Sequence, residues 1–162
     1  MTREEKINII EQERIKLQTA LNNLISIIGD IQISNIQQMP YGWRNSAKGR
    51  TVWRIIEEII SQNLEKYATE LNFSSVKPSE SEIGVYDFEF TVDGKVSYVN
   101  IKSSVLGGRE NKDDISKADG LINFYKENIN KNLYIAKFGI IFNNNMTISI
   151  SECVVFSYWL DT

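Results

Sequence analysis

GVYDFEFTVDGKVSYVNIKSS, residues Gly84 to Ser104, predicts a β-hairpin whose register follows from its own turn. Asp93-Gly94 suits a type I′ turn, in which both central residues need positive φ, and it lies between two alternating runs. With a two-residue loop Val92 opposes Lys95, and the other pairs are counted back from there. The predicted pairs are Phe90–Ser97, Glu89–Tyr98, Phe88–Val99, Asp87–Asn100 and Tyr86–Ile101.

The two faces of this hairpin differ in character. One face carries the residues expected in the core, which are Tyr86, Phe88, Phe90, Val92, Val99 and Ile101. The other face carries Asp87 and Glu89 on the first strand and Asn100 and Lys102 on the second. Opposed Cβ atoms lie roughly 5 Å apart, and a lysine also reaches a diagonal neighbour. We therefore expect a carboxylate, an amide oxygen and an ammonium group to converge here, although such residues are also ordinary on a solvated face.

Asp87, followed twelve residues later by Asn100-Ile101-Lys102, resembles the catalytic hairpin of the PD-(D/E)xK nucleases. This superfamily contains most type II restriction endonucleases. The segment Val99–Ser104 is similar to the aspartate-isoleucine-lysine-threonine-threonine stretch of its blunt-cutting members. The resemblance covers the order of elements from about Arg50 onward, but individual residues only in the hairpin.

The resemblance implies a Mg²⁺ site, with Mn²⁺ as a substitute, because hydrolysis of a phosphodiester needs a cation to neutralise developing charge and to activate water. In this site Asp87 would be a metal ligand, Ile101 would lend its carbonyl oxygen, and Lys102 would serve the attacking water. Asn100 stands where the family has its second acid, and Tyr86 stands where many members have proline. An asparagine brings no negative charge to the cation, so Asn100 is either natural, with a compensating acid, or an inactivating change.

Two glutamates are candidates for that compensating acid. Glu89 lies two residues after Asp87 on the same strand. Glu57 lies on a helix predicted from about Lys48 to Leu71, at the edge of an apolar face formed by Val52, Ile55, Ile56, Ile59, Ile60 and Tyr67. In the family the first core helix often adds an acid to the metal site. The alternative for Glu57 is a boundary glutamate paired with a nearby lysine.

Composition narrows the class of protein. The chain has 162 residues, 42% of them hydrophobic, and no run long enough to span a membrane, so we expect one soluble, cytoplasmic domain. The single cysteine, Cys153, lies in an apolar run and is expected to be a buried thiol. The absence of histidine excludes Ser-His-Asp and Cys-His catalysis and the usual zinc hydrolase sites.

We expect the chain to divide into an N-terminal helix with a linker, residues 1–39, which would serve as a dimerisation or DNA-contact arm, and a PD-(D/E)xK-like nuclease core, residues 40–162. Thr2–Ile28 has an apolar stripe, interrupted by Arg14, and the helix is expected to end at Gly29. This stripe is either core packing or the seam of a homodimer.

A basic stretch precedes the predicted core helix. Four basic residues and no acidic one occur between Ile31 and Ile56, and they are Arg44, Lys48, Arg50 and Arg54. Near Tyr41 and Trp53 they resemble a phosphate-contacting surface, although a basic lead-in to a helix is the plainer alternative. Further DNA contacts are expected just after Lys102, from Ser103, Ser104, Arg109, Asn111 and Lys112.

The remaining segments complete the predicted fold. A first strand is expected at Phe73–Val76, a helix from Asp113 or Asp114 to about Asn128, and strands at Leu133–Phe142 and Met146–Trp159. The order indicates an α/β fold with a mixed central sheet flanked by helices, like that of the restriction endonucleases.

The interpretation we favour is a type II restriction enzyme that cuts double-stranded DNA with magnesium as a homodimer. The alternatives are a structure-specific or repair nuclease of the same fold and a catalytically inactive DNA-binding domain.

Overall fold

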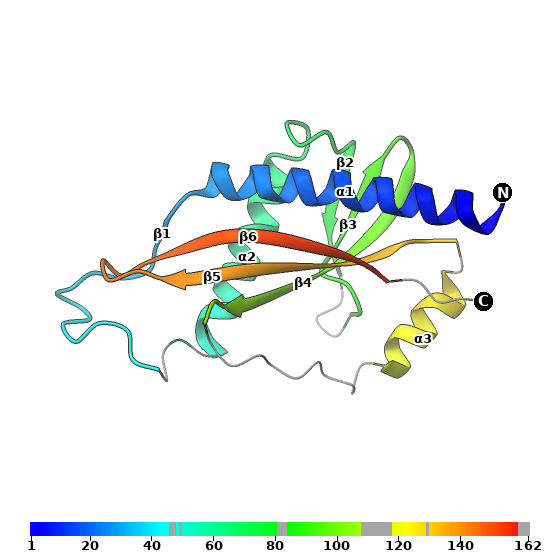
Figure 1. Ribbon diagram of the computed structural model, residues 1–162. Coiled ribbons are helices and arrows are strands. Elements are labelled where there is room, and N and C mark those ends of the chain that lie inside the picture. The colour runs from blue at the N-terminus through cyan, green and yellow to red at the C-terminus, as the bar shows by residue number, and fades with distance from the viewer. Residues whose placement is uncertain (46–47, 49, 81–83, 108–117, 129, 159–162) are drawn as a thin grey trace.

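The computed structural model describes residues 1–162 except 46–47, 49, 81–83, 108–117, 129 and 159–162. Within this part, three helices accompany one mixed sheet of six strands (Figure 1). The elements in chain order are α1 (Arg3–Ile28), β1 (Ile31–Gln32), α2 (Arg50–Lys66), β2 (Ser75–Pro78), β3 (Phe88–Val92), β4 (Lys95–Val105), α3 (Ala118–Glu127), β5 (Leu133–Phe142) and β6 (Thr147–Tyr158). The predicted mixed α/β sheet with an N-terminal helix is confirmed.

The strands lie in the order β1-β6-β5-β4-β3-β2. The strands β2, β3 and β4 are antiparallel neighbours, whereas β4 and β5 are parallel. A parallel pair requires a crossover connection, and α3 lies in the segment that joins these two strands. The sheet then continues with β6 antiparallel to β5 and with the short β1 at its edge.

The predicted hairpin register is confirmed from Phe88 to the turn, where Phe88 pairs with Val99 and Val92 with Lys95. Asp93 and Gly94 have φ values of 50° and 76°, as the type I′ turn requires. The prediction for Tyr86 was wrong. Strand β3 begins only at Phe88, so the alternation of faces stops there.

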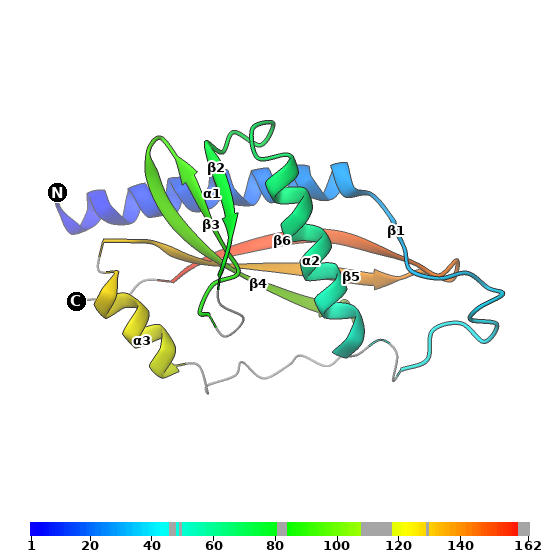
Figure 2. The ribbon, with the colours of Figure 1, turned by 180° about the vertical axis from the view of Figure 1, so that it is seen from behind.

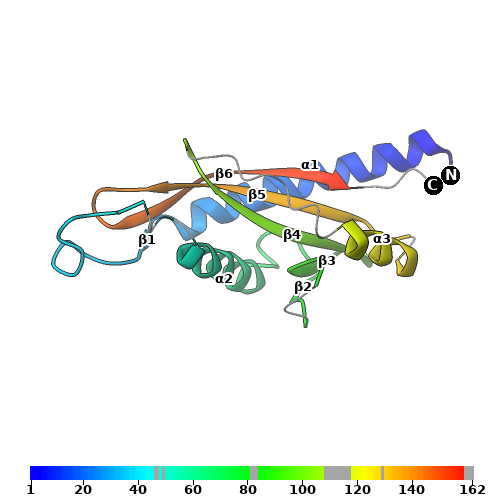
Figure 3. The ribbon, with the colours of Figure 1, turned by 90° about the horizontal axis from the view of Figure 1, so that it is seen from below.

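Tyr86 instead packs on the second face of the sheet. Its ring lies 4.6 Å from that of Tyr98, in an edge-to-face arrangement. Tyr98 points away from the core face of β4, and with Phe124 of α3 and Leu133 of β5 it forms a small second core. The helix α3 therefore covers one end of the face opposite the main core (Figure 3).

The main core lies between the other face of the sheet and helices α1 and α2. Its fully buried side chains include Leu17, Leu21 and Leu24 from α1 and Phe88, Phe90 and Tyr134 from the sheet. The apolar stripe of α1 is therefore used for core packing within the chain. Arg14, which interrupts the stripe, donates a hydrogen bond to the Val155 carbonyl at the free edge of β6.

The helix α2 crosses the sheet on the main-core side (Figure 2). It buries Val52, Ile56, Ile60 and Leu64, but Ile55 is 46% exposed, so its predicted burial was wrong. The helix is also shorter than the predicted Lys48–Leu71.

Other boundaries also differ from their predictions. Strand β2 begins two residues later than predicted, because the chain still turns after α2, with the Phe73 amide bonded to the Ala68 carbonyl. Strand β5 has its predicted bounds, and the two residues of β1 were expected to be linker. The predicted helix start at Asp113 or Asp114 lies outside the described residues. Among the helices that the structure describes, none has both the length and the apolar composition of a membrane span.

Candidate functional site

Asp87 lies just before β3, at the end of the hairpin far from the turn. Its side chain is exposed, and Oδ2 accepts a hydrogen bond from the backbone N–H of Ile101 at 2.5 Å. The Asp87 N–H donates to the Val99 carbonyl, and the Asp87 carbonyl accepts from Ser79 at the end of β2. These contacts fix the carboxylate beside β4 at the position between Asn100 and Lys102.

Asn100 is buried, with 7% of its surface exposed. Its Nδ2 donates a hydrogen bond of 3.0 Å to the carbonyl of Val85, two residues before Asp87. Val85 itself packs against the second core beneath α3. The amide of Asn100 therefore holds in place the segment that precedes Asp87. This role depends on the N–H group of the amide, which an aspartate would lack.

Lys102 is exposed on the face of β4 that also carries Tyr98 and Asn100. The adjacent Ser103 points to the opposite face, and its buried Oγ has no hydrogen-bond partner in the described part of the chain. The indole Nε1 of Trp53, on α2, is likewise buried without a partner there. Ser104 is half-buried. Lys102 is thus exposed to solvent, whereas Ser103 lies on the main-core face of β4, with Val99 and Ile101.

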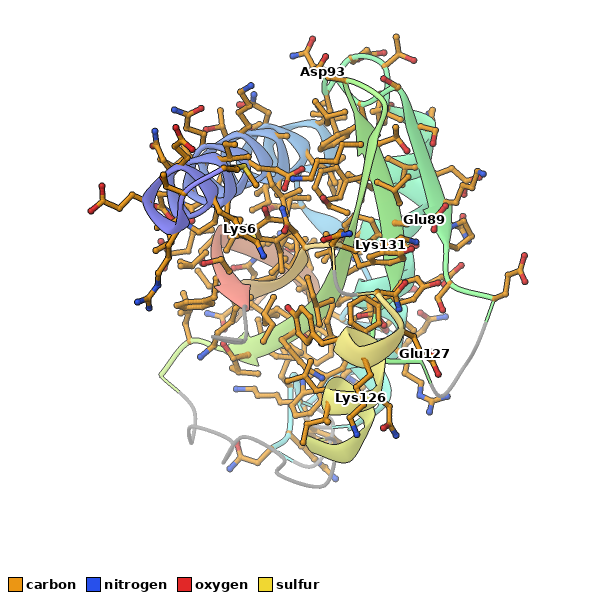
Figure 4. All side chains as sticks on the ribbon, turned by 90° about the vertical axis from the view of Figure 1, so that its right-hand side faces the viewer. Lys6, Glu89, Asp93, Lys126, Glu127 and Lys131 are labelled. Carbon is orange, nitrogen blue, oxygen red and sulfur yellow. The ribbon has the colours of Figure 1, made fainter. Side chains whose placement is uncertain are left out.

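Glu89 is half-buried and pairs across the sheet with Tyr98 on one side and Lys77 on the other. Tyr98 accepts a hydrogen bond from Lys131 Nζ at 2.5 Å. This bond is the main cause that raises the pKa of Lys131, and the negative charge of Glu89 adds to it. Glu89 and Lys131 lie on the same side of the molecule in Figure 4. The structure therefore places Glu89 in the electrostatic environment of Lys131.

Glu57 is half-buried on α2, in agreement with its predicted place at the edge of the apolar face. The helix α2 packs against the face with Val99 and Ile101, whereas Lys102 projects from the opposite face. Across the described residues, no three acidic or sulfur side chains gather as a metal-binding group. Asp87, Glu57 and Glu89 thus form no joint cluster.

The described part of the predicted basic stretch begins near the turn between β5 and β6 and continues into α2 (Figures 1 and 2). The Trp43 indole N–H donates to the Asn143 carbonyl at 2.9 Å and so fixes the stretch to this turn. The guanidinium of Arg44 lies 5.5 Å from the ring centroid of Tyr41, which is itself 81% exposed. Lys48 Nζ lies 5.8 Å from the ring centroid of Phe142.

The structure describes only some of the other residues that were predicted to contact DNA. Arg54 is exposed, and Arg50 is the first residue of α2. Arg109, Asn111 and Lys112 lie outside the described residues.

A polar cluster around Glu13 was missed by the sequence analysis. Glu13 of α1 accepts hydrogen bonds from Tyr134 OH at 2.5 Å, Asn132 Nδ2 at 2.6 Å and Ser97 Oγ at 2.9 Å. Burial acts to raise the pKa of Glu13, but these hydrogen bonds and the charge of Lys95 outweigh it, so the pKa is lowered. The available signal was an acidic residue between Ile10 and Leu17 on the buried side of an amphipathic helix.

A pocket of about 270 Å³ adjoins this cluster, between α1 and the tip of the hairpin. Its lining includes Glu13 and Lys16 from α1, Phe90 from β3, Asp93 from the turn and Lys95 from β4. The residues of the candidate nuclease site do not line it. The pocket is therefore separate from Asp87 and Lys102.

Cys153 is buried in the main core, as predicted. Its burial raises the pKa of the thiol to about 12. The thiol therefore stays protonated at neutral pH, and a nucleophilic role is disfavoured.

No protein-family model matches the chain, and no curated protein does. An exposed carboxylate held by a backbone N–H, with an exposed lysine one residue farther along the neighbouring strand, can bind a hydrated cation and an anion side by side.

Proposed function

We propose that the chain is a magnesium-dependent endonuclease that hydrolyses phosphodiester bonds in double-stranded DNA, as a type II restriction enzyme of the PD-(D/E)xK group. The hydrogen bond from Ile101 N–H to Asp87 Oδ2 is the observation that carries this proposal. It brings the first acidic residue of the proposed motif to the strand position next to its lysine. If these residues only formed a solvent-exposed face of the hairpin, no such contact would be required.

The topology supports the same proposal. Three antiparallel strands follow α2, a helix-containing crossover leads to a parallel strand, and an antiparallel strand follows at the far side. The order of elements and the mixed sheet are those that the resemblance to the restriction endonucleases leads us to expect. The short β1 and the long α1 add to that arrangement.

The donor set of the site suits Mg²⁺ with several retained waters, because this ion is commonly bound by only one or two carboxylates. Asp87 would hold the ion, with the Ile101 carbonyl as a further oxygen donor. The bound ion would neutralise charge on the phosphoryl group and lower the pKa of water. Lys102 would orient the attacking water, and Asn100 keeps the segment before Asp87 in place through Val85.

The experiment is cleavage of plasmid DNA with and without Mg²⁺, compared with DNA binding by the same protein. A restriction enzyme gives discrete bands that disappear with chelator. A structure-specific nuclease leaves linear duplex intact and cuts branched DNA. Failure to cut any of these substrates in Mg²⁺ or Mn²⁺ would exclude an active nuclease.

One observation favours the inactive DNA-binding domain as a second candidate. The amide of Asn100 is buried and donates to the Val85 carbonyl, so the position of the second acid is used for structure. Such a domain would bind duplex DNA in the cleavage experiment without cutting it in either metal.

A homodimer remains part of the proposal, because a palindromic target calls for twofold symmetry. The buried stripe of α1 no longer favours that helix as the interface, since Leu17, Leu21 and Leu24 pack inside the chain. Sedimentation velocity at micromolar protein concentration tests the dimer, and a monomer with or without DNA would contradict it.

A further inference from the structure

Strand pairing brings a second lysine next to Lys102. In the parallel ladder between β4 and β5, Lys102 is the partner of Lys137. The neighbouring pair Ile101 and Ala136 is buried in the main core, so both lysines project from the opposite face, where both are exposed. Adjacent strands lie about 4.8 Å apart, so the side chains of these paired lysines are close enough for their ammonium groups to repel each other.

Nothing that the structure describes neutralises these two charges. Neither Lys102 nor Lys137 has an ion pair or a hydrogen bond within the described residues. Other lysines near the hairpin differ in this respect, since Lys95 pairs with Glu13 and Lys131 bonds to Tyr98. Like charges directly opposite each other on a sheet are destabilising, so a polyanion that places a negative group near each lysine would relieve their repulsion.

Apolar neighbours of Lys137 strengthen its attraction for an anion. On β6 its partner is Val154, and the next residue on that face, Phe156, is 50% exposed. On β5 itself the preceding residue on this face is Ile135. An apolar border screens charge less well than water does, so an anion at the two lysines would be held more strongly.

The position relative to Asp87 indicates which anion this is. Asp87 meets β4 from the β3 side at Ile101, whereas Lys137 meets β4 from the β5 side. A carboxylate, Lys102 and Lys137 therefore follow one another across three neighbouring strands. A polyanion with regularly spaced phosphates can contact both lysines while one phosphate lies at Asp87.

We propose that Lys137 holds a backbone phosphate of the DNA strand being cut, next to the phosphate served by Lys102. The assignment rests on the proposed function of the Asp87 site. Lys137 acts as a point-charge anchor, as lysine commonly does for phosphate, and it contributes to binding rather than to the chemical step. Lys102 then remains the residue for turnover.

The experiment measures duplex DNA binding by fluorescence anisotropy over a range of salt concentrations. Lys137→Met keeps the apolar stem and removes the charge. It should weaken binding of any duplex and reduce the slope of log Kd against log salt by about 1. Lys137→Arg should restore the slope. The matched control is Lys126→Met, which removes an exposed lysine of α3 and should leave the slope unchanged (Figure 4).

Cleavage kinetics separate the two lysines. Lys137→Met should raise KM with little change in kcat, and Lys102→Met should lower kcat with little change in Kd. Thermal unfolding of the variant provides a test that needs no DNA. Loss of the repulsion should raise the Tm of Lys137→Met at low salt, and this gain should disappear at high salt.

The outcomes distinguish this inference from the proposed function. If the wild-type protein binds no duplex, the proposed function fails and the assignment of Lys137 fails with it. If the wild type binds DNA and Lys137→Met behaves like Lys126→Met, only the role of Lys137 is overturned. A reduced slope that Lys137→Arg restores supports the assignment.

Discussion

The side-chain amide of Asn22 on α1 bonds both backbone groups of Cys153 on β6. Its Oδ1 accepts from the Cys153 N–H at 3.0 Å, and its Nδ2 donates to the Cys153 carbonyl at 2.9 Å. One helical turn earlier, Gln18 accepts from Val155 N–H at 2.9 Å. Amide side chains of the helix thus satisfy the sheet edge where a further strand would otherwise pair.

Replacement of Asn22 by alanine should destabilise the protein by about 1–3 kcal/mol, because two backbone groups of β6 lose their partners. The matched control is Asn23→Ala, since Asn23 is the next residue of the same helix and is exposed. That control should change stability by no more than about 0.5 kcal/mol. Urea unfolding of the two variants gives the comparison, and equal stabilities would show that the edge contacts contribute nothing.

Asp87 should be essential for cleavage in either of two variants. Asp87→Ala and Asp87→Asn both remove the negative charge, and we expect each to slow cleavage by on the order of a thousandfold, roughly 4 kcal/mol of barrier. Their stabilities should differ, because only asparagine keeps an oxygen acceptor for the Ile101 N–H. Plasmid cleavage and urea unfolding measure the two effects. An alanine variant as active as the wild type would refute the site.

Asn100→Asp should lower stability in the absence of metal. The carboxylate would face the Val85 carbonyl, where the amide now donates a hydrogen bond, and the expected cost is about 1–3 kcal/mol. Mg²⁺ should recover part of that loss if the new carboxylate reaches the cation. Thermal unfolding with chelator and with Mg²⁺ tests this expectation.

Cleavage by the same variant decides the status of the asparagine. A gain of about a hundredfold, roughly 3 kcal/mol of barrier, would identify Asn100 as an inactivated second acid. Destabilisation without a gain in cleavage would show that the asparagine belongs to the working fold.

Glu13 should make stability depend on pH in the acid range. Its pKa is lowered in the folded protein, so its contribution is complete above the unfolded value, about 4.3, and is lost as the pH falls through the lower folded pKa. Glu13→Gln should therefore be less stable than the wild type at pH 7, and the difference should shrink below about pH 4. Urea unfolding at several pH values measures this difference. A difference that stays constant with pH would contradict the role of the ionised carboxylate.

The part of the fold that the sequence predicts best is determined by local chemistry. The turn Asp93-Gly94 determines the register of β3 and β4, because a two-residue loop leaves one pairing. Leu133–Phe142 is an apolar run with clear ends, and its bounds were predicted correctly. The helix α1 ends at Ile28, and Gly29, with a φ of 64°, caps it, as the glycine at this position indicates.

The parts that were missed depend on contacts between distant segments. The pairing of Lys102 with Lys137 comes from a parallel ladder, whose register no turn specifies. The burial of Asn100 depends on the segment at Val85 that covers it. The exposed side of α2 at Ile55 likewise depends on how that helix meets the sheet, which its periodicity alone does not determine.

The bonds between α1 and β6 also set a condition on how the protein is made. Asn22 and Cys153 are 131 residues apart in the chain, and Arg14 and Val155 are 141 apart. A ribosome releases the helix long before it releases the strand, so the apolar face of α1 is exposed throughout synthesis of the residues between them. Such long-range closure slows folding and leaves the nascent chain prone to aggregation. The helix that protects the finished sheet edge is thus a segment that needs protection during translation.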